Sequence, residues 1–246
     1  MLKPIMVNAA MEDVEMDVLK KSLTDIKMVQ EKVCTFYEGM IDGYPVVLCL
    51  TGVGMVNAAI STLTGINKYN PCAIIIEGTA GAHKKEIHRN DIVVSTDVIN
   101  INSIKTSARK EGEGVFVDNW THINFKHGDH KLVKLKADEN LVKLAQNIAG
   151  NNANGNVVFG SVGSGDVWNQ EADRILMISQ KLGTFCEDME GFAVFQVAEK
   201  YNIPAINIRV ISNNELLEER YDRTTGANSQ EFTLKLVREF INQIRG

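Results

Sequence analysis

Two polar clusters bracket one helix and one apolar strand in the segment CEDMEGFAVFQVAEKYNIPAINIRVISNNE, which spans residues 186–215. Glu187, Asp188 and Glu190 stand at the head of the expected helix, and the segment ends in Ser-Asn-Asn-Glu after the expected strand. A carboxylate at a helix N-terminus often only complements the helix dipole. Because ligands of layered α/β proteins bind outside strand ends, the two clusters could instead converge on one pocket.

Two further segments place glycines directly after expected strands. In IIIEGTAGAH, residues 74–83, two glycines straddle Thr79 and an alanine, which lets backbone N–H groups approach a ligand closely. This turn lacks the Gly-Lys-Ser/Thr ending of a P-loop. In GSVGSGDVWNQEAD, residues 160–173, a glycine turn presents Trp168, whose ring could stack on a planar ligand or cover the sheet edge. Each turn alone is also compatible with tight packing of a strand against a helix.

The composition bounds the possible functions. The chain has 246 residues, of which 44% are hydrophobic, and neither a linker nor a repeat divides it. We therefore expect a single α/β domain over residues 1–246. The net charge of -5 is spread along the chain without a basic stripe, which argues against a nucleic-acid partner.

No signal peptide or membrane span is recognisable in this sequence, and the cysteine usage is typical of an intracellular protein. The N-terminal stretch MLKPIMVNAAMEDVEMD has too short an apolar run for a signal peptide, and no later run is long enough to span a membrane. We therefore expect a cytoplasmic protein with no membrane partner. The four cysteines lie far apart, without C-x-x-C spacing and mostly within apolar runs, which favours reduced thiols in the core.

Apolar runs alternate with amphipathic segments, which is typical of a layered α/β fold whose sheet is covered on both faces. The Asp42-Gly43 pair predicts a hairpin turn, and residues 100–131 break the alternation as a long surface excursion. The expected strands are 4–9, 34–38, 45–50, 72–76, 91–98, 156–162 and 205–211, and the expected helices are 14–23, 54–69, 138–148, 190–201 and 228–244.

The order and spacing of several motifs resemble a known superfamily. GTAGAH, GSGDVWN and EDMEGFAVFQVAEKYNIPAINIRVISNN are similar to motifs of the nucleoside phosphorylase/nucleosidase superfamily, and above all to the 5'-methylthioadenosine/S-adenosylhomocysteine nucleosidases. The resemblance begins with NAAMEDVEMDVL and TGVGMVNAA, covers nearly the whole chain, and is weakest at residues 100–131. It implies a three-layer fold with a central twisted mixed sheet, and a purine nucleoside N-glycosyl hydrolase that uses no cofactor and no metal.

The resemblance also implies roles for individual residues. The knot of Asp188, Met189 and Glu190 should grip the ribose of a nucleoside substrate, with Met189 under the sugar and Glu190 accepting from its 2'- and 3'-hydroxyls. A carboxylate suits this role because it is acceptor-only and can receive two hydroxyls at once. The residues implied to line the sugar and base are Thr79, Gly81, Val167, Trp168 and Asn169.

A glutamate near the N-terminus should activate water. In the similar family this residue follows Ala-Met-Glu, but the spacing here differs by what looks like one inserted residue, so Glu12, Asp13 and Glu15 compete. We choose Glu15, because aligning it lets the apolar positions that follow match the family's first helix. The base must be a carboxylate within hydrogen-bond reach of the water.

The acceptor of the sugar is expected to be water. Phosphorylases of the hexameric branch hold phosphate with several arginines, one of them just before the glycine turn, where this chain has Glu77. A glutamate at that position would repel phosphate. The alternative is a phosphorylase that holds phosphate with Arg209 or Arg89, although Arg209 is better interpreted as a buried partner of the acidic knot.

The base-facing position departs from the similar family. Adenine-cleaving members usually end the late strand in Ser-Asp, whose carboxylic acid protonates purine N7, whereas this chain has Asn213. An amide cannot deliver a proton, although it can hydrogen-bond to the base. Asparagine is found in members that act on 6-oxopurine nucleosides, so a 6-oxopurine nucleosidase, a purine nucleoside phosphorylase and a non-catalytic nucleoside-binding paralogue are the alternatives.

The resemblance further implies a homodimer in which a loop of the neighbour closes the 5' side of the sugar. The excursion at residues 100–131 carries apolar side chains that a monomer would leave partly exposed. They are Val115, Phe116, Trp120, Ile123 and Phe125.

Overall fold

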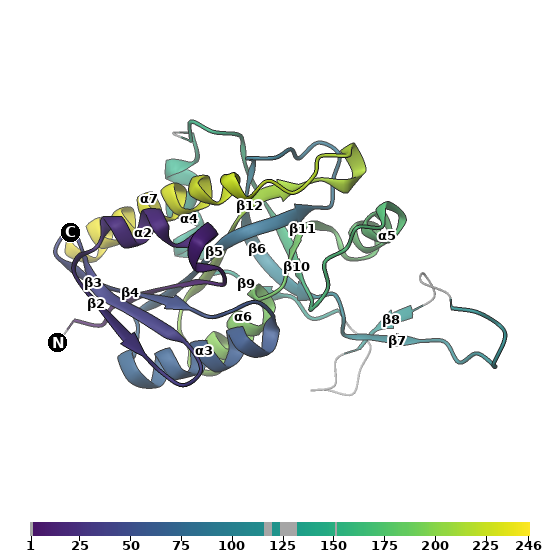
Figure 1. The fold of residues 1–246 in the computed structure, drawn as a ribbon, viewed down its shortest axis with the longest axis horizontal. Coiled ribbons are helices and arrows are strands. Elements are labelled where there is room, and N and C mark those ends of the chain that lie inside the picture. The colour runs from purple at the N-terminus through teal and green to yellow at the C-terminus, as the bar shows by residue number, and fades with distance from the viewer. Residues whose placement is uncertain (1, 116–119, 124–131, 151) are drawn as a thin grey trace.

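The computed structural model describes residues 2–115, 120–123, 132–150 and 152–246, with the strands and helices shown in Figure 1. Phe116 and Phe125 of the predicted excursion lie outside the described residues. The described strands are β1 (Ile5–Ala9), β2 (Thr24–Gln30), β3 (Thr35–Ile41), β4 (Tyr44–Leu50), β5 (Ala73–Ala82), β6 (Ile92–Asn100), β7 (Ile104–Thr106), β8 (Trp120–His122), β9 (Leu135–Lys136), β10 (Val157–Ser164), β11 (Thr184–Asp188) and β12 (Ala205–Asn213).

One large mixed sheet organises the described part of the chain. Its strand order is β11-β10-β6-β12-β5-β1-β4-β3-β2, and β9 pairs with β6. Strand β1 is parallel to both β4 and β5, and β5 is parallel to β12, whereas β12 and β6 are antiparallel. Strands β7 and β8 form a separate small sheet that projects from the body of the molecule (Figure 1).

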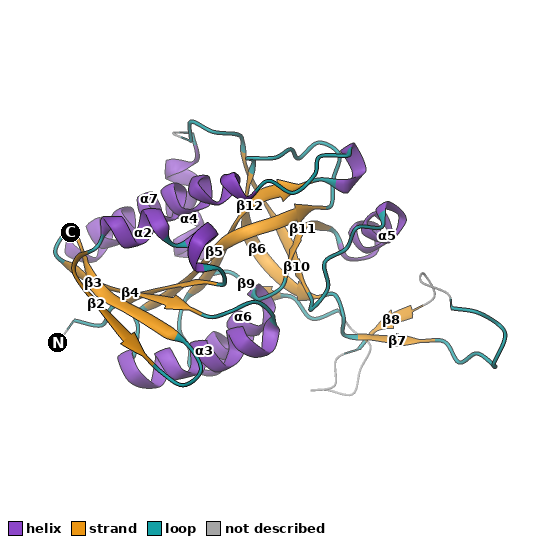
Figure 2. Ribbon diagram, in the orientation of Figure 1, coloured by secondary structure: helices purple, strands orange, loops and turns teal. Residues whose placement is uncertain are grey.

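Helices cover both faces of the large sheet, as Figure 2 shows. Helices α3 and α6 pack together on one face, and α1, α2 and α4 pack with α7 on the other. The expected three-layer α/β fold is therefore confirmed. No described helix is long and apolar enough to cross a membrane. The helices are α1 (Glu12–Glu15), α2 (Asp17–Ser22), α3 (Met55–Tyr69), α4 (Glu139–Ala149), α5 (Ala172–Leu182), α6 (Gly191–Lys200) and α7 (Gly226–Arg245), with 3-10 turns η1 (Glu215–Leu217) and η2 (Arg223–Thr225).

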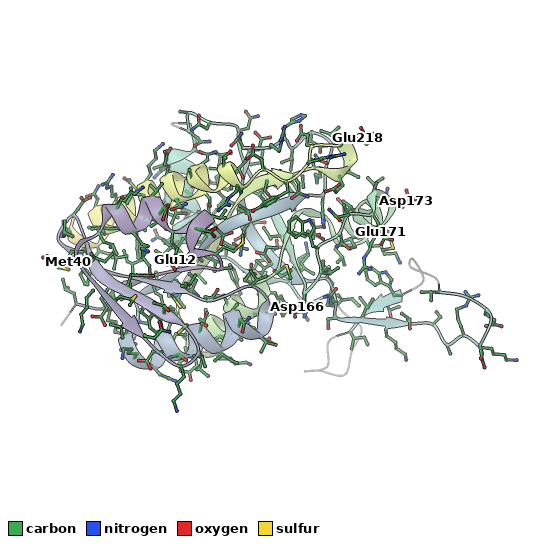
Figure 3. The ribbon with its side chains drawn as sticks, viewed as in Figure 1. Glu12, Met40, Asp166, Glu171, Asp173 and Glu218 are labelled. Atoms are coloured by element: carbon green, nitrogen blue, oxygen red, sulfur yellow. The ribbon has the colours of Figure 1, made fainter. Side chains whose placement is uncertain are left out.

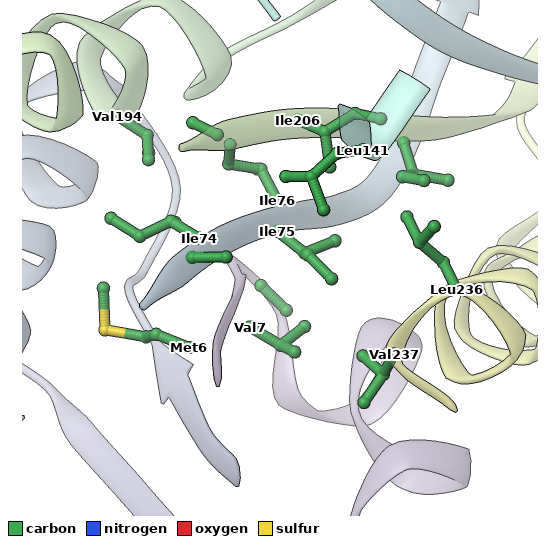
Figure 4. Packing of buried hydrophobic residues seen from close by; sticks show 14 of the residues in the cluster. Met6, Val7, Ile74, Ile75, Ile76, Leu141, Val194, Ile206, Leu236 and Val237 are labelled. Atoms are coloured by element: carbon green, nitrogen blue, oxygen red, sulfur yellow. The ribbon is translucent and has the colours of Figure 1, made fainter. Parts of the chain in front are cut away.

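The core consists of apolar strand residues packed between these two helix layers. Successive side chains of a strand point to opposite faces, so a continuous apolar run such as 73–76 fills both layers at once. Figure 4 shows Ile74 on the side of Val194 from α6, and Ile75 on the side of Leu236 and Val237 from α7. All five side chains are at most 1% exposed.

Strand β5 continues to Ala82, although the sequence predicts that it ends at Ile76. Residues beyond Ile76 pair with β12 along one edge, and Gly81 pairs with Glu187 of β11 along the other. The predicted glycine turn is therefore wrong, because these residues complete sheet hydrogen bonding on both sides. The pairing of β11 with β5 closes strands β11, β10, β6, β12 and β5 into a ring.

The sequence predicted one hairpin turn correctly but did not predict one exposed strand and one helix. The Asp42-Gly43 hairpin turn is confirmed, with φ of 49° and 72° at the two residues, as a two-residue hairpin turn requires. Strand β2 and helix α5 were not predicted from the sequence. Most residues of β2 are exposed, with Ile26 and Met28 facing solvent, so its apolar pattern does not mark a buried strand.

The core packing predicts different sensitivities along α7. Leu236 is fully buried between helix and sheet, whereas Ile244 on the same helix is 41% exposed. Leu236→Ala should lower the free energy of unfolding by about 2–5 kcal/mol, because it deletes buried methyl groups and leaves a cavity. Ile244→Ala is the matched control and should change it by about 0.5 kcal/mol or less. Urea denaturation of both variants measures the difference, and equal losses would contradict this account of the core.

Candidate active site

A cavity of about 350 Å³ opens where β5, β11 and β12 end and the loop after β10 begins. This position, at the carboxyl ends of strands, is where layered α/β proteins bind ligands. Of the residues predicted from the sequence, those lining the cavity are Glu15, Thr79, Gly81, Val167, Trp168, Asp188, Met189, Glu190 and Asn213. The two polar clusters of residues 186–215 do converge on one pocket.

Glu15 lies at the end of α1 and is 1% exposed. Its Oε2 accepts hydrogen bonds from the backbone N–H of Ala10 at 2.9 Å and of Met11 at 3.0 Å. Its Oε1 accepts from the N–H of Thr79 at 2.9 Å and from the Thr79 hydroxyl at 3.2 Å. These contacts fix the carboxylate against the cavity wall, which is the preorganisation that a general base needs.

The two competing carboxylates point elsewhere. Glu12 forms an ion pair with Lys20 at 2.6 Å and a hydrogen bond with Tyr37 away from the cavity (Figure 3). The side chain of Asp13 is 74% exposed and pairs with Arg223 at 2.6 Å. Glu15 is therefore the candidate among the three that the tertiary structure brings to the cavity.

Arg209 on β12 is the cation that pairs with the two carboxylates of the acidic knot. It is 1% exposed, and its Nε lies 2.9 Å from Asp188 Oδ2 while its Nη2 lies 3.3 Å from Glu190 Oε2. The interpretation of Arg209 as a buried partner of the acidic knot is confirmed. Breaking such a buried pair from one side leaves an uncompensated charge, so these contacts also hold the site in place.

Asp188 lines the cavity, but its oxygens are engaged by the protein. Besides Arg209, Oδ2 accepts from Asn207 Nδ2 at 2.6 Å, and Oδ1 accepts from the backbone N–H of Gly191 at 3.1 Å. The second contact satisfies a free N–H at the start of α6. Asp188 therefore helps to position Arg209 and the start of α6.

Glu190 is the member of the knot with an unusual acidity. It is 5% exposed, and burial raises its pKa to about 7 although the Arg209 guanidinium opposes that rise. Its Oε1 accepts from the backbone N–H of Gly54 at 3.0 Å, at the start of α3. A carboxyl group with such a pKa changes its charge near neutral pH.

The start of α3 is tied to the same wall by Asp166, a residue of the second glycine segment (Figure 3). Asp166 Oδ1 accepts from the backbone N–H of Met55 at 2.7 Å. Gly54 has a φ of 100°, which favours glycine, and a Cβ there would lie 3.0 Å from Asp166 Oδ1. Because glycine allows this close approach, the backbone N–H groups of Gly54 and Met55 can donate to Glu190 and to Asp166 of the loop after β10.

Gly81 and Asn213 form the opposite end of the cavity. The Asn213 amide donates from Nδ2 to Glu215 Oε1 at 3.2 Å, and its Oδ1 accepts from the Ser212 hydroxyl at 3.0 Å. A Cβ added at Gly81 would lie 3.4 Å from Asn213 Nδ2 and 3.8 Å from Glu187 Cγ. Glycine at position 81 therefore keeps the space between these two polar side chains open.

Asn169, which was predicted to line the sugar and base, is not among the residues that line the cavity. Its backbone N–H donates to Glu187 Oε1 at 2.9 Å, and its side-chain Nδ2 donates to Glu187 Oε2. The side chain that reaches the cavity from this pair is Glu187. The sequence marked Glu187 only as one of the acidic residues at the head of the expected helix, because nothing local distinguishes it from a helix-dipole partner.

Tyr221 also lines the cavity and was not predicted. Its ring meets that of Trp168 edge to face, with ring centroids 5.2 Å apart. Trp168 is still 54% exposed, so the two aromatic rings form one rim of the opening. Tyr221 follows the last strand in an irregular segment without periodicity, and no signal in the sequence could have placed it here.

Glu77 has a different position from the one expected. It is fully buried outside the cavity lining, and its pKa is raised well above the usual range, first by burial and then by the charge of Glu15. Glu77 is therefore not a side chain that a phosphate bound in this cavity would contact. Among the described residues, no cluster of His, Cys, Asp and Glu is arranged to hold a metal ion.

Comparison with known proteins agrees with this geometry. The phosphorylase superfamily model matches residues 4–242. A 5'-methylthioadenosine/S-adenosylhomocysteine nucleosidase of Bacillus cytotoxicus is 30% identical over 244 residues, which cover 96% of this chain and 98% of the relative. The nucleosidase of the same name from Bacillus cereus strain G9842 is 32% identical over 212 residues, or 85% of each chain.

A solved structure shows the same fold. The 5'-methylthioadenosine/S-adenosylhomocysteine nucleosidase of Neisseria meningitidis, in complex with methylthio-immucillin-A, superposes with a TM-score of 0.79 at 23% identity. The match covers 96% of this chain and 99% of that one. The chain therefore belongs to the phosphorylase superfamily, within which it resembles the 5'-methylthioadenosine/S-adenosylhomocysteine nucleosidases.

Proposed function

We propose that this chain hydrolyses the N-glycosidic bond of purine nucleosides, with the reaction type of the 5'-methylthioadenosine/S-adenosylhomocysteine nucleosidases. The observation that carries the proposal is the convergence of Glu15 and Glu190, from opposite ends of the sequence, on one cavity beside Arg209. Hydrolysis of this bond needs an activated water and stabilisation of a positively charged sugar ring. The two carboxylates supply one function each.

Glu190 is the proposed sugar clamp. Among the described residues, each of its oxygens has one hydrogen-bond partner, the Gly54 N–H and the Arg209 guanidinium, and a carboxylate has capacity for about two further donors. The 2'- and 3'-hydroxyls of a ribose provide two such donors. As the bond to the base breaks, positive charge develops on the ring, and the negative charge of Glu190 stabilises it.

Glu15 is the proposed base that accepts a proton from the attacking water. Its carboxylate is held by backbone N–H groups, so its orientation does not depend on a flexible side-chain partner. The water oxygen forms the new bond to the sugar carbon, its proton passes to Glu15, and the electron pair of the broken bond leaves with the base. Thr79 holds Glu15 Oε1 and lines the cavity beside it.

The charges that line the cavity favour water over phosphate as the acceptor. Glu15, Glu187, Asp188 and Glu190 all line it, and among the described lining residues Arg209 is the one Lys or Arg side chain. Because Arg209 already pairs with two carboxylates, a phosphate dianion would meet net repulsion.

The alternative phosphate ligand, Arg89, is also elsewhere. It lies outside the cavity lining, with its guanidinium on the carbonyl of Arg220. Arg89 therefore does not supply a positive charge to the cavity.

We also propose a homodimer formed through α3. Val56, Ile60 and Leu63 are 67%, 43% and 38% exposed and follow helical spacing along one face of that helix. Val53, which is 44% exposed, continues this face and lines the cavity. A second copy covering α3 would bury the apolar face and close the cavity mouth together. Val115 on the excursion is 92% exposed and remains a further candidate contact.

The activity is tested by incubating the protein with 5'-methylthioadenosine and other purine nucleosides, with and without phosphate. Free base with a reducing sugar is expected in both cases, whereas the 1-phosphate of the sugar would indicate a phosphorylase and no product would indicate a binding protein. Glu15→Gln should abolish hydrolysis yet still bind a nucleoside analogue, because it removes the proton acceptor and keeps the shape.

Glu12→Gln is the matched control for Glu15→Gln, since Glu12 is on the same short helix and outside the cavity. It should have near-normal turnover. If Glu12→Gln were inactive and Glu15→Gln active, the assignment of the water-activating residue would be wrong.

Glu190→Gln should lower turnover by about 100-fold or more, the scale of losing one preorganised charge at the transition state. In the unmodified protein, the Glu190 pKa of about 7 means that the acceptor form is lost as the pH falls below that value. We therefore expect kcat/KM to fall on the acidic side of about pH 7, because this ratio reports ionisations of the free enzyme.

The measurement is kcat/KM between about pH 5 and 9 for the unmodified protein and for Glu190→Gln. The variant has no carboxyl group at this position, so the acidic fall near pH 7 should disappear from its profile. Near-normal turnover of Glu190→Gln, or the same acidic fall in both proteins, would refute the sugar clamp.

Val56→Glu should convert the dimer to a monomer, because it places a charge in the centre of the exposed α3 face. Ile26→Glu is the control, since Ile26 is 47% exposed but lies on edge strand β2. Sedimentation velocity at micromolar concentration distinguishes the species. A monomeric unmodified protein, or a dimer that survives Val56→Glu, would exclude this interface.

A further inference from the structure

We propose that Gly81, Glu187 and Asn213 form a base corner that selects a 6-oxopurine, such as hypoxanthine or guanine, over adenine. This inference rests on the proposed nucleosidase function and adds the identity of the leaving base. It assigns Glu187 as a base-recognition residue that contacts the purine directly.

The geometry separates a sugar end from a base end of the cavity. Thr79 binds Glu15 and its carbonyl accepts from Arg209 Nη1 at 3.4 Å, so this part of β5 belongs to the sugar end. Gly81, two positions further along β5, lies between Asn213 and Glu187, with which it pairs across the two neighbouring strands. The base of a nucleoside bound at Glu190 must therefore project toward the base corner.

Glu187 is a buried acceptor that still has capacity toward the cavity. It is 7% exposed, and its carboxylate accepts from the Asn169 N–H, from Asn169 Nδ2 and from His83 Nε2 at 3.0 Å. His83 Nδ1 in turn lies 2.7 Å from the Thr184 hydroxyl, which can donate to it. These described donors occupy three of the roughly four acceptor positions of a carboxylate.

The Asn213 amide has a defined orientation. Glu215, as a carboxylate, can only accept, so the amide atom facing it at 3.2 Å is the donor Nδ2. The Ser212 hydroxyl donates to Oδ1 on the other side. Since an amide carries two N–H donors, one remains for a ligand beyond this described contact. The base corner thus offers a donor at Asn213 and an acceptor at Glu187.

This pattern is complementary to a 6-oxopurine. The ring edge of hypoxanthine or guanine carries an N1–H donor next to the O6 acceptor. The N1–H can donate to Glu187, and O6 can accept from Asn213 Nδ2. When the bond to the sugar breaks, its electron pair spreads into the base and onto O6, where the Asn213 N–H stabilises it, and the base later takes a proton from water. This accounts for a nucleosidase without a carboxylic acid at position 213.

Adenine presents the opposite pattern at the same edge. Its N1 is an acceptor, so a lone pair would face the Glu187 carboxylate, and its 6-amino group is a donor. A buried acceptor left without a donor loses a hydrogen bond and keeps its desolvation penalty. Sites built to hydrogen-bond one edge therefore reject an analogue with the reversed edge strongly.

The test compares 5'-methylthioinosine with 5'-methylthioadenosine, which share the sugar and the 5' substituent and differ at the edge of the base. The unmodified protein should have the higher kcat/KM for 5'-methylthioinosine, by at least about tenfold. Glu187→Gln should lower kcat/KM for that substrate on the order of 10- to 100-fold, because it replaces a charged acceptor with a neutral amide that has one acceptor oxygen. Asn213→Asp should shift the ratio of the two kcat/KM values toward the adenine substrate.

Glu190→Gln is the matched control, since it should slow both substrates equally and leave the ratio unchanged. Calorimetric binding of hypoxanthine and adenine to the unmodified protein gives a reading that does not depend on the folding of any variant, and hypoxanthine should bind more tightly.

Release of both bases with adenine preferred, or a ratio unaffected by Glu187→Gln in a folded variant, would overturn the base corner while leaving the nucleosidase function intact. Release of neither base, with tighter binding of hypoxanthine retained, would overturn the proposed function but support the base corner.

Discussion

One buried guanidinium governs the site. Arg209 lies within β12 and pairs with Asp188, the last residue of β11, and with Glu190, which directly precedes α6. Without it, two carboxylates would be buried side by side with no cation, at a cost of several kcal/mol. With it, Asp188 can bind the start of α6 and Glu190 can keep the start of α3 in place. The contacts that hold the layers together are thus the same contacts that shape the sugar end of the cavity.

Strand β5 runs along the cavity and contacts polar side chains at both of its ends. Its residues beyond Ile76 remain in the strand because they pair with β12 as far as Gly81, and Gly81 and Ala82 also pair with β11. Extended backbone places Thr79 against Glu15 and Gly81 between Asn213 and Glu187. One strand therefore sets the distance between the group proposed to activate water and the groups proposed to read the base. This division lets the base end vary without disturbing the sugar end.

The similarity to known nucleosidases supports the proposed sugar end of the cavity but does not identify the base that binds at the other end. The match to 5'-methylthioadenosine/S-adenosylhomocysteine nucleosidases spans nearly the whole chain, and the carboxylates proposed for water activation and sugar binding both line the cavity. The base end has its own polar network of His83, Glu187 and Asn169, which depends on hydrogen bonds among buried side chains. Such networks change the donor and acceptor pattern without changing the fold, so family membership alone does not define the leaving base.

The sequence by itself determined the layered α/β fold, because long buried strands and amphipathic helices leave distinct apolar periodicities, and it determined the acidic knot and Trp168 as site candidates. Its motifs also pointed to Glu15 among three neighbouring carboxylates. Only the tertiary structure placed Tyr221 at the rim, turned Asn169 toward Glu187, and buried Glu77 outside the cavity lining. These outcomes depend on which side chains meet across β5, β11 and β12. Local sequence encodes the backbone path, whereas hydrogen-bond partners and desolvation are set by residues distant in the chain.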